Sequence, residues 1–252
     1  MKSSINFCEP DYIISEYVAE FHNSWSSLLL VYMGFIGYFY GDPLNQMKHK
    51  LCFFVLGTIG IGSTWLHGSL SSYGQALDEL PMLFMNIALF QSLLTLKRRE
   101  GQIHLFYTCL LLAVVQSYIY IRFQEYYYIF LINYISSVVV IVIWTTYLAN
   151  YDGKFDKTRH NLWISSLFSY VVLGSSLWVV EMNYCDWLLP YYTKFNGLSF
   201  HILWHLGAGL GTYQIIVFLV YTNLQNLVSR AERVVVAYHL GILPICKIKK
   251  NE

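Results

Sequence analysis

The chain has 252 residues, of which 56% are hydrophobic and only 12% are charged, and its net charge is +1. Soluble domains carry about 25% charged residues, so this composition favours a protein whose main solvent is lipid. The near-neutral charge gives no support for a nucleic-acid partner, and five cysteines in a chain of this length do not indicate a disulfide scaffold.

Seven apolar segments follow one another with no repeat or long linker between them. Most approach the roughly 17–25 residues that a helix needs to cross a bilayer. We therefore predict an all-α membrane protein with one domain over residues 1–252: a leader at 1–23, a seven-transmembrane helix bundle at 24–221 and a tail at 222–252. The segments lie at about residues 24–40, 51–68, 80–96, 103–121, 128–149, 161–182 and 198–221.

Basic residues are distributed unevenly between the two sides of this bundle. Thirteen of the 16 lysines and arginines lie in one set of loops and in the tail, and only Lys2, Arg122 and Lys194 lie on the other side. Loops rich in lysine and arginine stay in the cytosol. With an odd number of spans, this predicts an N-terminus outside the cell or in a lumen, and a cytosolic C-terminus.

Three of the eight histidines, His67, His201 and His205, lie inside the predicted spans. The predicted orientation places all three near the outer ends of their spans, and the last two share one helix face because they are four residues apart. A single histidine inside a membrane is more often a hydrogen-bonding contact between helices than a metal ligand. Three at one depth predict a zinc centre, and three protein ligands that leave the fourth position open are typical of catalytic zinc.

Asp78 and Ser63 belong to the same outer layer of the bundle. An acid at the start of a helix ordinarily serves as a cap or as a partner of the helix dipole, which is an adequate explanation for Glu79. The nearby histidines favour a catalytic role for Asp78 instead. Ser63 lies one helical turn before His67, a position that supports helix packing and an active-site role equally.

The leader places three carboxylates and an amide within fifteen residues: Asn6, Glu9, Asp11 and Glu20. The ordinary explanation is a solvated segment. The alternative is a calcium site, since calcium takes six to eight oxygen ligands, main-chain carbonyls included. The spacing does not match an EF-hand.

Several motifs stand in order along the whole chain. They are Cys8-Glu9 with Tyr12, YVAEFHN at 17–23, GIGSTWLH at 60–67, LDELPM at 77–82, and HILWH at 201–205 with GLGTY at 209–213. Together they resemble the alkaline ceramidases, which are intramembrane amidases with seven helices found in the endoplasmic reticulum and Golgi. That family belongs to a wider group of membrane hydrolases that includes the progestin and adipoQ receptors.

The resemblance implies a role for each of the residues singled out above. His67, His201 and His205 match zinc ligands, Ser63 matches an active-site serine, and Asp78 matches a catalytic aspartate. Calcium ligands are implied at Asn6, Glu9, Asp11 and Glu20 and at the main-chain carbonyl of Phe7, and a disulfide is implied between Cys8 and Cys185. The sequence departs from the animal pattern at Asn6 and Asp11, where an amide and an acid are exchanged, and at Phe7, which replaces a tryptophan.

The function implied by the resemblance is zinc-dependent hydrolysis of the amide bond of ceramide to a sphingoid base and a free fatty acid. The substrate would enter from the membrane of the endoplasmic reticulum or Golgi, with no obligate protein partner. Two alternatives remain open here. One is a receptor of the progestin/adipoQ type with weak or different lipid hydrolase activity, and the other is a transporter or channel.

The chain ends in Lys249-Lys250-Asn251-Glu252, which resembles a cytosolic dilysine signal for retrieval to the endoplasmic reticulum. The simpler explanation is a basic tail that follows the positive-inside rule.

Overall fold

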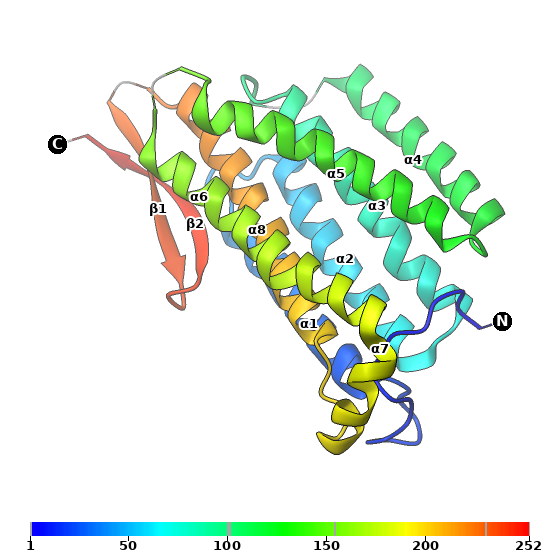
Figure 1. Cartoon of the computed structure of the whole chain (residues 1–252). Helices are drawn as coiled ribbons and strands as arrows, with labels where there is room; N and C mark the ends of the chain where they lie inside the picture. Colours follow the sequence, from blue (N-terminus) through cyan, green and yellow to red (C-terminus); the bar gives the residue numbers. More distant parts are fainter. Residues whose placement is uncertain (1, 100–101, 154, 230, 252) are drawn as a thin grey trace.

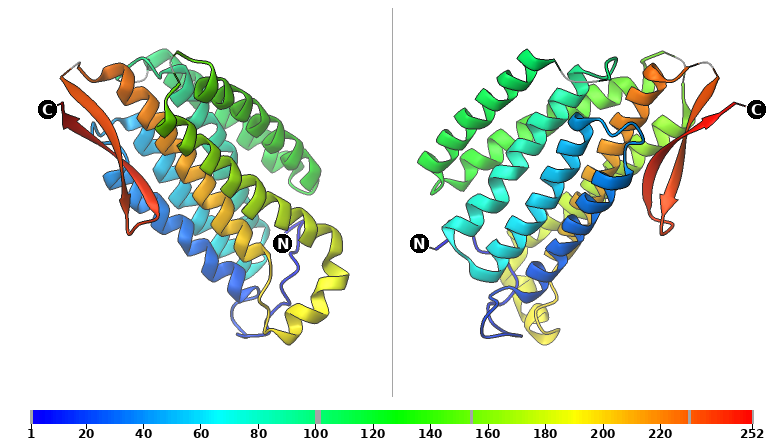
Figure 2. Two further views of the ribbon diagram at one scale, coloured as in Figure 1. Left: turned by 60° about the vertical axis from the view of Figure 1, so that its left-hand side comes forward. Right: turned by 180° about the vertical axis from the view of Figure 1, so that it is seen from behind.

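The computed structural model describes residues 2–99, 102–153, 155–229 and 231–251, and they are mostly helical (Figure 1). The two ends of the chain lie at opposite ends of the bundle (Figures 1 and 2). The helices are α1 (Phe21–Tyr40), α2 (Met47–Ser69), α3 (Ser72–Leu94), α4 (Ile103–Phe123), α5 (Tyr127–Asn150), α6 (Lys157–Leu167), the π-helix η1 (Phe168–Ser175), α7 (Ser176–Lys194) and α8 (His201–Leu227).

Six helical rods of the described chain are long and apolar enough to cross a membrane. They are α2, α3, α4, α5, α8 and the continuous rod formed by α6, η1 and α7. The helix α1 is not among them because its first turns carry His22, Asn23 and several serines. Each of the seven predicted segments overlaps α1 or one of these six rods, while the count of seven spans and the direction of the ends stay predictions.

The helix α8 is the centre of the bundle. It contacts α1, α2, α6 and η1, and most of its second half is fully buried. Close approach to η1 depends on Gly207, where a Cβ would overlap the backbone of Gly174. By contrast, α4 and α5 turn most of their apolar side chains outward, as expected for helices that face lipid.

The third helix begins earlier than the sequence predicts. The segment that we expected at 80–96 starts at Ser72, because the Ser71 side chain caps the helix by accepting a hydrogen bond from Gly74 N at 3.0 Å. Asp78 and Glu79 therefore lie inside α3 rather than at its start. The prediction that Glu79 is a capping acid is wrong.

The tail forms a β-hairpin that the sequence analysis did not predict. Strand β1 (Glu232–His239) pairs antiparallel with β2 (Leu243–Lys250), and the hairpin lies along the bundle beside α8 and α1 (Figure 2). Tyr213 on α8 donates a hydrogen bond to the Pro244 carbonyl at 3.0 Å, and Cys246 N donates to the Gly41 carbonyl at 3.4 Å. Lys249 and Lys250 are thus the last two residues of a paired strand.

Candidate metal centre and substrate cleft

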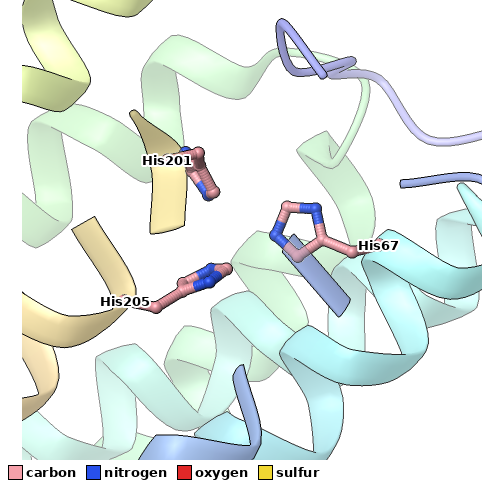
Figure 3. Close-up of side chains that lie close together, drawn as sticks. All are labelled: His67, His201 and His205. Carbon is pink, nitrogen blue, oxygen red and sulfur yellow. The ribbon is translucent and has the colours of Figure 1, made fainter. Parts of the chain in front are cut away.

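The last turns of α2 and the first turns of α8 bring three histidines together. His67, His201 and His205 are at most 3% exposed, and one nitrogen of each lies within 4.8 Å of the others. Figure 3 shows the three rings converging from the two helices. Residues more than 130 positions apart in the sequence thus form a single group that could hold a metal ion.

The hydrogen bonds of these rings test whether a metal fits. Glu20 Oε2 accepts a hydrogen bond from His67 Nδ1 at 2.5 Å, and Ser26 Oγ lies 2.7 Å from His205 Nδ1. Oxygen partners of this kind orient metal-binding histidines. Within the described residues, His67 Nε2 and His201 Nδ1 are buried without a hydrogen-bond partner. Unpaired buried nitrogens are rare and costly, so the three histidines fit a metal ion that would bind them.

Ser63 lies directly beside this group. Its Oγ is 3.3 Å from His205 Nε2 and 2.9 Å from Ser27 Oγ, and the residue is buried. The hydroxyl can therefore donate a hydrogen bond to a molecule that reaches the histidines.

Asp78 approaches the same place from α3. A Cβ at Gly62 would overlap the Leu77 carbonyl oxygen, so the backbones of α2 and α3 touch immediately before Ser63 and Asp78. Asp78, Ser63 and His205 line one small cavity of about 40 Å³. The structure therefore brings together all five residues predicted for zinc binding and catalysis.

A larger cavity of about 430 Å³ opens beside the small one, between α5 and the η1–α7 part of the long rod. Asp78 and His201 lie at its polar end. Its remaining walls are largely apolar and include Tyr134, Val138, Val142, Val171 and Trp178. A cleft of this size and character suits the hydrocarbon chains of a lipid.

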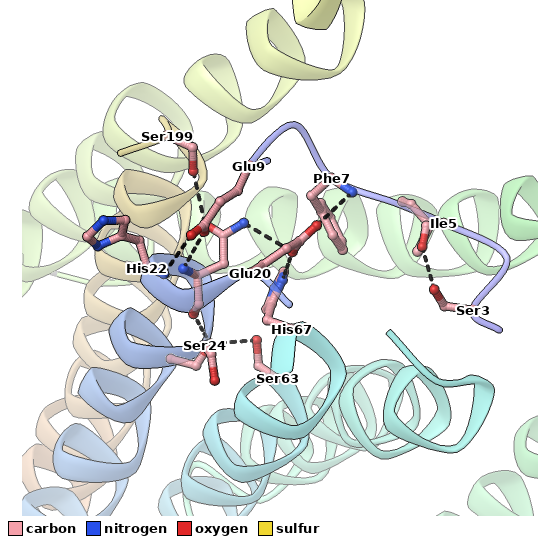
Figure 4. A network of polar contacts seen from close by, with 12 residues as sticks. Ser3, Ile5, Phe7, Glu9, Glu20, His22, Ser24, Ser63, His67 and Ser199 are labelled. Atoms are coloured by element: carbon pink, nitrogen blue, oxygen red, sulfur yellow. Dashed lines mark hydrogen bonds and ion pairs between the residues drawn. The ribbon is translucent and has the colours of Figure 1, made fainter. Parts of the chain in front are cut away.

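The leader packs against the histidine group, as Figure 4 shows. Glu20 accepts hydrogen bonds from Phe7 N and from Asn23 Nδ2, both at 3.2 Å, in addition to the one from His67. Glu9 accepts from His22 N at 2.7 Å and from Asn23 N at 2.8 Å, and so caps α1. Burial raises the pKa of Glu9 and of Glu20 to about 7.

The remaining residues of the predicted calcium site are more open. Asn6 and Asp11 are exposed, and Phe7 is partly buried. The calcium site stays a prediction. Cys8 and Cys185, the pair implied by the resemblance, form a disulfide in the structure with their Cα atoms 5.5 Å apart, which joins the leader to α7.

Sequence reasoning missed three contributions to the site. The Phe7 ring lies 4.7 Å from the His67 ring and 4.3 Å from the His201 ring, measured between centroids. Glu79 is buried in the wall of the large cavity, where it accepts hydrogen bonds from Tyr120 Oη at 2.6 Å and Gln75 Nε2 at 3.0 Å. Ser26 could have been found from the polar positions 23, 26 and 27, which share one helix face.

Comparison with known proteins decides the family. The family model described as Ceramidase matches residues 1–247. This chain belongs to the ceramidase family. Alkaline ceramidase 3 of Mus musculus is 27% identical over 251 residues, covering 96% of this chain and 91% of the relative. Alkaline ceramidase of Arabidopsis thaliana is 28% identical over 258 residues, covering 98% and 93%.

Alkaline ceramidase YPC1 of Saccharomyces cerevisiae is 24% identical over 242 residues and covers 86% of this chain and 75% of the relative. The predicted resemblance to the alkaline ceramidases is confirmed, and with it the prediction that the chain is an enzyme of this family.

Proposed function

We propose that this ceramidase hydrolyses the amide bond of ceramide with the help of zinc, and releases a sphingoid base and a free fatty acid. The observation that carries the proposal is the histidine group with its unpaired nitrogens, placed beside Asp78 at the polar end of a large apolar cleft. The names of the relatives support ceramide as the substrate.

His67, His201 and His205 would hold the zinc. When bound, zinc polarises the amide carbonyl and lowers the pKa of a water molecule. Glu20 and Ser26 hold the rings of His67 and His205 in place through their Nδ1 atoms.

Asp78 acts as the general acid–base in this mechanism. Its carboxylate takes the proton of the attacking water as the water oxygen bonds to the amide carbon, and delivers it to the amide nitrogen as the C–N bond breaks. The hydroxyl of Ser63 donates a hydrogen bond to the carbonyl oxygen while that oxygen gains negative charge. Both side chains line the same small cavity, and this supports the two roles.

The test is release of sphingoid base from a panel of ceramides by the purified protein in detergent. Asp78→Asn should abolish release because the proton has no acceptor, while Ser63→Ala should lower the rate about 10²–10³-fold, the typical cost of one lost oxyanion donor. Both variants should keep their metal. Normal turnover in Ser63→Ala would reject the role of that residue, and no release from any ceramide by the wild type would favour the receptor-like alternative.

We further propose a calcium site formed by Asn6, Phe7, Glu9, Asp11 and Glu20. Carboxylates gathered on one short segment supply the oxygen ligands that calcium prefers. Calorimetric titration should detect calcium binding to the wild type and weaker binding to Asp11→Asn, which removes one carboxylate ligand. Asp11 is exposed and caps no helix, so the substitution should not disturb the fold. Absence of binding to the wild type would remove this proposal.

The proposed location is the endoplasmic reticulum or Golgi membrane, with seven spans and the C-terminus in the cytosol. Six candidate spans support a multi-pass membrane protein. The location is tested by imaging the tagged protein, and unchanged distribution after replacing Lys249 and Lys250 with serine would reject dilysine retrieval.

A further inference from the structure

The two faces of the C-terminal hairpin differ in character. Cross-strand partners share a face, and the register pairs Val234 with Ile248 and Val236 with Cys246 on the face that packs against the bundle. The opposite face is partly exposed: its cations are exposed and its apolar residues are half-buried. It carries Arg233 opposite Lys249, Val235 opposite Lys247, and Ala237 opposite Ile245.

The hairpin tip reaches the middle of the bundle. His239 Nε2 is 3.0 Å from the hydroxyl of Tyr32, which lies midway along α1, and the Tyr213–Pro244 hydrogen bond lies midway along α8. Tyr238, Leu240 and Ile242 at the tip are between 61% and 77% exposed. Large apolar side chains so exposed beside membrane-spanning helices indicate a tip that faces the membrane.

The open end of the hairpin lies just beyond the end of the last helix. Arg233 follows the end of α8 at Leu227 by six residues, and the register places Lys249 directly opposite Arg233 and Lys247 two residues away on the same face. Because α8 is a candidate span, Arg233, Lys247 and Lys249 follow the point where the chain leaves the membrane, at the level of the lipid headgroups.

These three cations repel one another. Arg233 lies directly opposite Lys249, where Cβ atoms are about 4.5–5.5 Å apart and like charges are destabilising, and Lys247 is the diagonal neighbour. The ion pairs found in the described residues are those of His49 with Asp42 and of His67 with Glu20. Within these residues, therefore, no carboxylate forms an ion pair with any of the three cations. The nearby Glu232 lies on the inner-face register.

We propose that Arg233, Lys247 and Lys249 bind the headgroup of an anionic phospholipid. A phosphate at this position offsets the repulsion of the cations, which share one face of the hairpin. Basic clusters beside the last span are the usual determinants of binding to anionic lipids. This site is separate from the ceramidase cleft, which shares none of its residues.

The test is native mass spectrometry of the purified full-length protein in neutral detergent, titrated with dioleoyl phosphatidylserine or dioleoyl phosphatidylcholine. We expect the wild type to bind phosphatidylserine at least tenfold more tightly. The triple variant Arg233→Gln/Lys247→Gln/Lys249→Gln should lose this preference, since each cation near the membrane surface contributes about 1 kcal/mol, or about fivefold in affinity.

The matched control is Lys97→Gln/Arg99→Gln/Lys157→Gln, which removes three exposed cations on the same side of the bundle, two after α3 and one at the start of α6, and should keep the preference. The single variant Lys247→Gln, expected to lose about fivefold, keeps the test decisive if the triple variant does not fold. The proposal fails if the hairpin variants bind phosphatidylserine as the wild type does, if the control loses as much, or if inorganic phosphate competes as well as the lipid.

Discussion

The proposed chemistry of this ceramidase depends on a few side chains whose partners come from distant parts of the chain. The spacing of His201 and His205, and the predicted depth of His67, were sufficient to predict that these residues meet. The partners that orient them were not predictable in the same way. Glu20 reaches His67 only because the leader folds back over the ends of α1 and α2, where Ala19 N donates to the Gly68 carbonyl and Glu20 N to the His67 carbonyl.

The contact between Glu20 and His67 leads to a prediction at the residue scale. Glu20→Gln replaces the charged acceptor of the His67 Nδ1–H group by a neutral amide, and loss of such a partner typically lowers metal affinity about 10–100-fold. Competition with a zinc chelator measures the change. The matched control is Glu9→Gln, because the Glu9 carboxylate accepts hydrogen bonds from main-chain N–H groups at the start of α1 and from no histidine ring. Equal zinc affinity in Glu20→Gln and the wild type would contradict the orienting role.

At the scale of the element, it was easier to predict that a helix is present than to predict the residues at which it begins and ends. The apolar runs predicted every helical rod, but the polar residues Ser72, Gly74 and Gln75 precede the predicted third segment, in a stretch where α3 already runs. Gln75 is satisfied there by Ser4 of the leader, a contact that no local pattern contains. The hairpin was missed because Leu240 and Gly241 adopt positive φ at its turn, and a leucine in that position gives no turn signal.

The contact of α2 with α3 gives the prediction at this scale. Gly62→Ala must separate the two backbones where Ser63 and Asp78 face one cavity, and a displacement of about 1 Å can cost about 10²-fold in rate. We expect turnover to fall by about this factor while bound zinc is retained.

Gly57→Ala is the matched control, since it adds the same methyl group to the same helix and the nearest atom that it meets is 4.0 Å away. Steady-state ceramide hydrolysis and metal content distinguish the two variants. If both hydrolyse ceramide as the wild type does, the close contact at Gly62 does not set the position of Asp78.

At the scale of the whole molecule, polar residues are buried at one end of the bundle and a cleft leads from them towards lipid. The helix α8 carries two of the three histidines at its first turns and is held by helices on several sides, so the candidate metal group rests on the most buried helix of the described chain. The cleft beside it is walled by α5, which has few buried residues. This arrangement supports the proposal that the lipid substrate reaches the histidines from the bilayer without entering water.

The most direct measurement of the central claim is zinc content together with ceramide turnover, in the purified wild type and in His205→Ala. The exposed His104→Ala serves as the control. We predict about one zinc per chain and measurable release of sphingoid base for the wild type and for His104→Ala, with both lost in His205→Ala and release lost from the wild type after treatment with a chelator. Full turnover in a wild type that carries no zinc, or in His205→Ala, would contradict the zinc mechanism.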